Sequence, residues 1–179
     1  LLNHMLTQAS DYDAFVIVGG FFISELKAYI NDILSEEVRN KIILVNNEKY
    51  AEYGSGWSLY LGIKSVFEKY GTSFDELLFA EGDLYVDDES FAAVSGSSDS
   101  VITINSEAIK AKKAVALYYD LDNVPHYIYD TSHGQLVINE PFTAIYNSGQ
   151  IWKFTDSGLL KKVTDSIPES GHEGTNLVL

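Results

Sequence analysis

The pattern with the clearest chemical potential is Glu76-Leu-Leu-Phe-Ala-Glu-Gly-Asp83, an apolar run that ends in a Gly-Asp pair before an acidic, aromatic loop. In an α/β protein, ligands bind at the carboxyl ends of buried strands, because the loops there are free to carry functional groups. Gly82 would let a ligand approach the backbone, and Asp83 offers a hard oxygen ligand for Mg²⁺ bound to a nucleotide phosphate. The structural alternative is that Asp83 serves as a helix N-cap or a turn residue.

A second polar segment, residues 47–59, lies between an apolar run and a helix pattern. Asn47 and Ser58 offer side-chain hydrogen bonds, while Gly54 and Gly56 expose backbone amides near a helix N-terminus, where anions are favoured. The structural alternative is that Ser58 is only an N-cap and Tyr50 only a loop anchor. Aromatic faces able to stack on a base or a cation belong to Tyr53, Trp57 and Tyr60.

These segments need a sheet to position them. Short apolar runs at 14–18, 42–45 and 77–80 predict parallel strands buried on both faces. Between them, two amphipathic patterns predict helices. The first has Ser24 as its N-cap and an apolar face made of Leu26, Ile30, Ile33 and Leu34. The second ends at Gly71 and has an apolar face made of Leu59, Ile63, Val66, Phe67 and Tyr70. This β-α-β-α-β order predicts a parallel sheet with right-handed crossovers.

The character of the chain changes after Asp83. The pattern predicts a short helix at 88–94, a loop at 95–100, and strands at 101–104, 114–119, 126–129, 136–138 and 142–146. A helix broken near Gly158 should follow, with an apolar face of Ile151, Phe154, Leu159, Leu160 and Val163. Residues 176–179 look like the start of a further strand. Because no repeat or linker interrupts residues 1–179, we expect one domain.

The composition of the chain excludes several classes of protein and of binding site. The chain carries 26 acidic and 12 basic residues, a formal net charge of −14, so it lacks the basic surface of a nucleic-acid binder. Without cysteine it has no disulfide or thiolate zinc site. No apolar run is long enough to span a membrane and no signal-peptide pattern opens the chain, so we expect a cytoplasmic protein without a membrane partner.

The order Asn47-x-x-Tyr50, Ser58-Leu59 opening a helix, and a strand ending in Gly82-Asp83 resembles the sugar-phosphate and phosphocholine nucleotidyltransferases of the GT-A-like fold. The resemblance covers about residues 14–83. It implies a three-layer α/β/α domain, with a mostly parallel sheet and antiparallel additions. By that resemblance, Asp83 would be the catalytic residue and hold Mg²⁺, with Glu173 as second metal ligand. The pocket for the nucleotide and substrate would be lined by Asn47, Gly56, Trp57, Ser58 and Gly82.

Family members also have a first strand and a Gly-rich, Arg-containing phosphate loop, which residues 1–179 lack. We therefore expect the domain to be incomplete at both ends and residues 1–179 alone to be inactive. The implied enzyme would join a nucleoside triphosphate to a phosphorylated sugar or alcohol, such as a sugar 1-phosphate or phosphocholine, and release pyrophosphate. The alternatives are a non-catalytic nucleotide- or sugar-binding domain of the same fold, and a GT-A glycosyltransferase.

Overall fold

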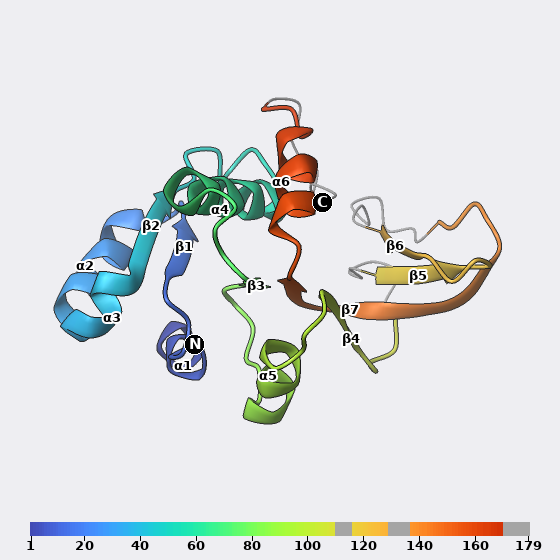
Figure 1. Cartoon of the computed structure of the whole chain (residues 1–179), viewed down its shortest axis with the longest axis horizontal. Coiled ribbons are helices and arrows are strands. Elements are labelled where there is room, and N and C mark those ends of the chain that lie inside the picture. The colour runs from blue at the N-terminus through green and yellow to red at the C-terminus, as the bar shows by residue number, and fades with distance from the viewer. Residues whose placement is uncertain (110–115, 129–136, 170–179) are drawn as a thin grey trace.

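The computed structural model describes residues 1–109, 116–128 and 137–169 and shows a mixed α/β fold, as the sequence predicts (Figure 1). The helices are α1 Leu2–Gln8, α2 Ile23–Ile33, α3 Glu36–Lys41, α4 Ser55–Tyr70, α5 Asp88–Ser95 and α6 Ser157–Asp165. The strands are β1 Phe15–Gly19, β2 Ile42–Asn46, β3 Leu77–Ala80, β4 Val101–Asn105, β5 Ala116–Asp120, β6 Pro125–Ile128 and β7 Phe142–Phe154. None of the helices in these ranges is both long and apolar enough to cross a lipid bilayer.

Strands β1 and β2 pair in parallel, with Phe15 opposite Ile42 and Gly19 opposite Asn46. Helix α4 covers one face of this pair: a Cβ added at Gly62 would lie 3.2 Å from a methyl carbon of Val18. The opposite face packs against α1 and α2 in a core centred on the buried residues Leu6, Phe15, Ile30 and Leu34. Two of the three strands that the apolar runs predict therefore form a parallel pair covered by helices.

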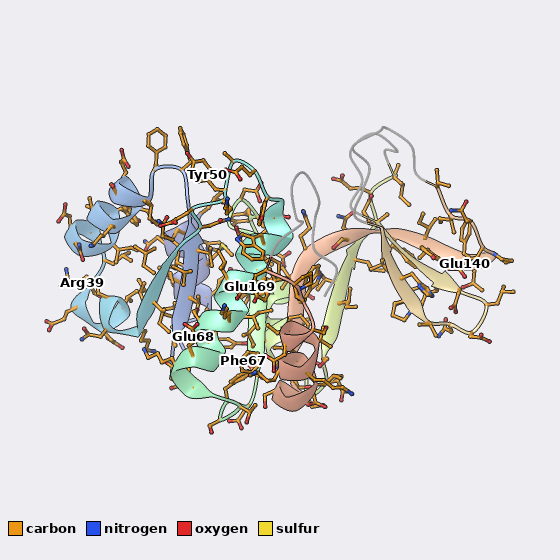
Figure 2. All side chains as sticks on the ribbon, turned by 90° about the horizontal axis from the view of Figure 1, so that it is seen from above. Arg39, Tyr50, Phe67, Glu68, Glu140 and Glu169 are labelled. Atoms are coloured by element: carbon orange, nitrogen blue, oxygen red, sulfur yellow. The ribbon has the colours of Figure 1, made fainter. Side chains whose placement is uncertain are left out.

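The long strand β7 organises the rest of the chain. It pairs antiparallel with β3, β4 and β5, and β5 continues into β6. The register with β4 shifts between Ile102 and Ile104, opposite a turn-like kink at Gln150, whose φ is +59°. Beyond the kink, β5, β6 and the first half of β7 extend away from the helices as an antiparallel ribbon (Figure 1). In Figure 2, Glu140 lies near the outer end of this ribbon, and Arg39 lies at the opposite end of the molecule.

The third predicted parallel strand is positioned differently from the expectation. Strand β3 has the predicted residues, but its only pairing in the described part of the chain is antiparallel, with β7. All four of its side chains are half-buried, whereas the sequence predicts a strand buried on both faces. The apolar run alone could not reveal this, because edge and central strands of similar composition differ only in their neighbours.

Four local predictions are wrong, two about the last helix and two about α2. Ile151 and Phe154 belong to β7, and α6 begins only at Ser157, where Asp156 caps it by accepting a hydrogen bond of 2.8 Å from the Leu159 amide. Gly158 lies in the first turn of α6 and does not break it. In α2 the N-cap is Phe22 rather than Ser24, and Ile33 is 65% exposed instead of facing the core.

Other local predictions are confirmed only in part or lie partly or wholly outside the described residues. The predicted strand at 136–138 is absent over its described residues, 137 and 138, and the predicted strand at 176–179 lies outside the described residues. Helix α4 has the predicted apolar face at its buried positions Leu59, Ile63 and Phe67 and ends at Gly71 as expected. It begins one turn earlier than expected, so Ser58 is not its N-cap.

An ion pair between the buried Lys153 and the half-buried Glu76 fastens β7 to the segments beside it. The side chain of Lys153 is 1% exposed, and its Nζ lies 2.5 Å from an oxygen of Glu76. The same ammonium group donates hydrogen bonds of 2.6 Å to the carbonyls of Ser95 and Ser97. Buried charges are tolerated when they are paired and hydrogen-bonded in this way. One lysine thus links the start of β3 and the end of α5 to the long strand.

Candidate functional site

The carboxyl ends of β1 and β2 meet the N-terminus of α4 through Asn47. Its backbone amide donates to the Gly19 carbonyl at 2.7 Å, which joins the ends of the two strands. Its side-chain Nδ2 donates to Ser58 Oγ at 2.9 Å, and its Oδ1 accepts from the Lys49 amide at 2.9 Å. Asn47 is only 2% exposed, so these bonds occupy its polar atoms inside the protein. The structure therefore brings together two predicted site residues, Asn47 and Ser58, as the anchor of this loop.

Trp57 lies at the same helix N-terminus, within an aromatic cluster. It is 8% exposed; its ring meets Tyr53 edge-on, with ring centroids 5.1 Å apart, and stacks on Tyr60 at 4.9 Å. The neighbouring Gly56 is also buried. Aromatic pairs of these geometries stabilise a core beyond the area they bury. Residues of this chain thus surround Trp57, and a role for it in stacking on a ligand stays a prediction.

The second group of predicted site residues lies in the loop after β3. Gly82 and Asp83 are both exposed, in a turn where the Leu84 amide donates to the Glu81 carbonyl at 3.3 Å. Burial raises the pKa of the Glu81 carboxyl above its ordinary value, and the charge of Asp83 raises it further. The loop therefore holds two carboxylates close enough to influence each other. The N-cap of α5 is Asp87, so Asp83 does not cap that helix; it is a turn residue, which is the other structural alternative that the sequence offers.

Helix α1 holds the far side of this loop in place. His4 Nε2 lies 2.9 Å from the Val86 carbonyl, and its ring stacks on Tyr85 with ring centroids 4.7 Å apart. Gln8 Nε2 donates to the same carbonyl at 3.0 Å and to Asp88 Oδ1 at 2.8 Å. Asp83 is thus presented on a loop anchored at its next residues, while its own carboxylate remains exposed.

In the described part of the chain, the two groups of predicted site residues are not linked to each other by hydrogen bonds. Among the described residues, no hydrogen bond or ion pair joins Asp83 to Asn47 or Ser58. Glu173, the predicted second metal ligand, lies outside the described residues. Within residues 1–109, 116–128 and 137–169, no group of three or more His, Asp or Glu side chains is arranged as a metal site. A carboxylate pair such as Glu81 and Asp83 still suits Mg²⁺, which typically takes one or two protein carboxylates and completes its shell with water and phosphate.

Sequence reasoning missed two features near these residues. Glu81 is the carboxylate next to Asp83, and its position directly after the apolar run was the available signal. Exposed rings of Phe21, Phe22 and Tyr50 form a second aromatic cluster on the loops after β1 and β2, from which Tyr50 projects in Figure 2. Phe22 has a left-handed φ of +60°, which is unusual for a bulky residue and could not be read from its sequence.

Comparison with known families gives one match, which covers residues 1–179 and is described as a domain of unknown function (DUF6564). The chain belongs to this family. Neither the curated proteins nor the solved structures include a significant match. Since the family description states no activity, a function for this chain has to be inferred from its own residues.

Proposed function

We propose that the chain is a three-layer α/β/α nucleotidyltransferase domain that joins a nucleoside triphosphate to a phosphorylated sugar or alcohol. The observation that carries the proposal is Asn47, buried and hydrogen-bonded where β1, β2 and the N-terminus of α4 converge. This edge has the properties of ligand sites in α/β proteins: strand carboxyl ends, adjacent loops and a helix N-terminus that favours anions. The exposed Gly82-Asp83 turn after β3 supplies an acidic group for the same chemistry.

In the proposed reaction, an oxygen of the acceptor's phosphate attacks the α-phosphorus of the nucleotide in line. A new phosphorus–oxygen bond forms as the bond to the β-phosphate breaks, and pyrophosphate leaves. Asp83 and Glu81 would hold Mg²⁺, which neutralises charge on the phosphates. Asn47 and Ser58 would fix the loop beside the nucleotide. No side chain of the protein forms a covalent intermediate.

The test uses the natural polypeptide that contains residues 1–179. Pyrophosphate release is measured for the four nucleoside triphosphates against sugar 1-phosphates and phosphocholine, with Mg²⁺ present. We expect one combination to react and Asp83→Asn to lower its turnover at least ~100-fold without changing the melting temperature. Asp99→Asn is the matched control, because Asp99 is also exposed on a loop.

Other outcomes separate the alternatives. Release of a nucleoside diphosphate from a nucleotide sugar would indicate a GT-A glycosyltransferase instead. Nucleotide or sugar binding by calorimetry, without turnover of any combination, would indicate a binding domain. If neither binding nor turnover is found, or if Asp83→Asn retains full activity, the proposed site is wrong.

A further inference from the structure

The second aromatic cluster, made of Phe21, Phe22 and Tyr50, exposes its rings instead of burying them. The three residues are 67%, 62% and 48% exposed. The ring centroid of Phe21 lies 4.1 Å from that of Phe22 and 5.9 Å from that of Tyr50, so the rings form one continuous surface. Single apolar residues are common on protein surfaces, whereas contiguous exposed groups of them mark binding sites. The cluster is therefore a candidate contact surface for a ligand.

The backbone holds these rings in place before any ligand binds. Phe22 has φ +60° and ψ +31°, a left-handed conformation that bulky residues rarely adopt and that is concentrated at functional sites. A Cβ added at Gly20 would overlap the Cβ of Tyr50, so Tyr50 lies directly on the backbone of the loop after β1. Rings that are fixed in advance lose less conformational entropy when a ligand binds to them.

The position of the cluster connects it with the proposed nucleotide site. Strands β1 and β2 are parallel and end at Gly19 and Asn46, so both loops that carry the rings leave the same edge of the sheet. Asn47, on which the proposed function rests, joins these loops through its amide bond to the Gly19 carbonyl. Tyr50 projects from this edge in Figure 2. The cluster thus borders the edge at which the proposed function places the nucleotide.

The other aromatic rings beside Asn47 contact each other. Trp57 and Tyr60 are 8% and 5% exposed and stack on each other, with ring centroids 4.9 Å apart. Tyr53 meets the Trp57 ring edge-on, and the ammonium group of Lys49 lies 5.7 Å from the centroid of the Tyr53 ring. A base stacks on an aromatic side chain that has an open face. At this edge the rings of Phe21, Phe22 and Tyr50 offer more open surface than these three.

Distance selects the part of the nucleotide that can reach the cluster. Asp83 follows β3, which is not paired with β1 in the described part of the chain. Paired strands are about 4.8 Å apart, so strands that are not neighbours are roughly 10 Å or more apart. The transferred phosphates and the acceptor must lie at the metal on Asp83. The base is separated from the α-phosphate by the ribose, so it can extend from the metal toward the loops after β1 and β2.

The charge around the cluster agrees with this selection. Residues 20–27 and 47–53 carry three acidic and two basic side chains, all of them exposed: Glu25, Glu48, Glu52, Lys27 and Lys49. Lys49 also forms an ion pair with Glu52, with 3.1 Å between its Nζ and the carboxylate. A surface of this kind does not attract phosphate, whereas an uncharged base is not repelled by it.

We propose that the second aromatic cluster is the surface on which the base of the nucleoside triphosphate stacks. Phe21 is its central residue, because its ring contacts both of the others. This inference rests on the proposed function and adds three binding residues to it. The rings position the nucleotide and take no part in bond making or breaking.

The test separates binding of the base from binding of the phosphates. Calorimetry with Mg²⁺ present measures the affinity of the natural polypeptide for the four nucleoside triphosphates and for inorganic tripolyphosphate, which has no base. Stacking contributes about 1–3 kcal/mol per base, so we expect Phe21→Ala to weaken nucleotide binding about 5- to 100-fold. Affinity for tripolyphosphate should not change. The KM for the nucleotide should rise, while the KM for the acceptor stays the same.

Three further variants distinguish stacking from a structural role. Phe21→Trp keeps an aromatic face and should retain the parent affinity, whereas Phe21→Leu keeps only an apolar side chain and should lose affinity as Phe21→Ala does. Phe142→Ala is the matched control, because Phe142 is an exposed aromatic residue of the ribbon, 46% exposed, and its loss should leave nucleotide affinity unchanged. Melting temperatures of all variants check that the fold is intact.

The failure of this inference differs from the failure of the proposed function. If the parent binds or turns over a nucleotide and Phe21→Ala and Phe21→Leu bind it equally well, only the stacking surface is wrong. Equal weakening of nucleotide and tripolyphosphate binding, or a higher KM for the acceptor alone, would also overturn the stacking role. If the parent binds no nucleoside triphosphate, the proposed function is wrong and this inference with it.

Discussion

The two carboxylates at the ends of β3 show how a single residue's surroundings decide its role. Burial opposes ionisation of Glu76, but Lys153 and Tyr12 outweigh it and lower the pKa of the Glu76 carboxyl. At the other end of the strand, burial and the charge of Asp83 raise the pKa of Glu81. Glu76 is part of a satisfied ion pair that stabilises the fold. At Glu81 the raised pKa means that the negative charge is disfavoured by its surroundings, and perturbed pKa values of this kind are common at functional sites.

Replacing Lys153, the ion-pair partner of Glu76, tests the structural role of that ion pair. Lys153→Met leaves the half-buried Glu76 carboxylate and the carbonyls of Ser95 and Ser97 without their donor, so we expect a loss of about 1–3 kcal/mol in unfolding free energy. Urea unfolding measures the change. Lys64→Met is the control: its pair with Glu169 is exposed, and its loss should stay below about 1 kcal/mol. Equal effects of the two substitutions would contradict this role for Lys153.

The raised pKa of Glu81 predicts a pH dependence with a definite sign. The folded state holds the Glu81 proton more tightly than the unfolded state, so this stabilisation is fully present below the ordinary pKa of 4.5 and is lost as pH rises through the folded pKa. Glu81→Gln should therefore be more stable than the parent at pH 7 and indistinguishable from it in acid. Denaturant unfolding of Glu81→Gln and of the parent, at pH 7 and in acid, measures the two differences in stability.

Glu76→Gln provides the comparison of opposite sign. Because the pKa of Glu76 is lowered, its contribution is present above pH 4.5 and is lost as pH falls through the folded pKa. This variant should be less stable than the parent at pH 7, and the difference in unfolding free energy between the two should disappear in acid. Two variants that respond to pH in the same direction would contradict the assignment of these carboxylates.

At the scale of elements, β7 is the strand on which the second half of the fold depends. It runs from Phe142 to Phe154 and pairs with three other strands. Its kink at Gly149 and Gln150 packs closely on β4: Thr103 Oγ1 donates to the Ile151 carbonyl at 2.8 Å and accepts from the Ile151 amide at 3.2 Å. The kink lets one continuous strand serve both the helix-covered core and the antiparallel ribbon.

This close packing predicts a cost for a single methyl group. In Gly149→Ala, the new Cβ would overlap the side chain of Thr103 and come within 3.2 Å of its backbone carbonyl carbon. We expect a loss of about 1–3 kcal/mol from overpacking, measured by thermal or urea unfolding. Gly82→Ala is the matched control, because a Cβ there meets nothing within 4 Å, and its change should remain within ~0.5 kcal/mol. Comparable losses at both glycines would rule out the overpacking explanation.

At the scale of the whole molecule, charge is the dominant property. The formal net charge is −14, and the exposed Glu and Asp side chains are distributed over the helices and loops. Repulsion among these like charges destabilises the compact folded state. The Debye length shortens from about 30 Å at 0.01 M salt to about 10 Å at 0.1 M, which is enough to screen charges on opposite sides of a domain. Salt should therefore stabilise this protein.

We expect the melting temperature at pH 7 to rise by roughly 2–5 °C over that salt range, equivalent to about 1 kcal/mol for a chain of this size. The control is the same titration near the isoelectric point of about 4.5, where the net charge and hence the salt effect should be close to zero. Differential scanning calorimetry measures both. A salt response that is larger near the isoelectric point than at pH 7 would contradict the repulsion account.

Local pattern sufficed to predict much of this fold. The apolar runs of β1, β2 and β3 are strands within one or two residues of their predicted limits, and the apolar spacing of α4 identifies its face and its end at Gly71. These features depend on neighbours close in sequence, through side-chain periodicity and end signals. The candidate residues Asn47, Ser58, Gly82 and Asp83 were likewise visible, because each lies at the end of a strand or the start of a helix.

Pairing between distant segments was decided only by the tertiary structure. The antiparallel partner of β3 is 71 or more positions further along the chain, as in the pair Ala80 and Ile151, and nothing within the β3 run specifies it. The helical spacing that includes Ile151 and Phe154 was overridden because β3 and β4 hydrogen-bond to that segment on both sides. Lys153 reads as a surface residue in sequence, and it is buried because Glu76, Ser95 and Ser97 converge on its ammonium group. Long-range hydrogen bonds and burial have no local signature, so they appear only when the chain is folded.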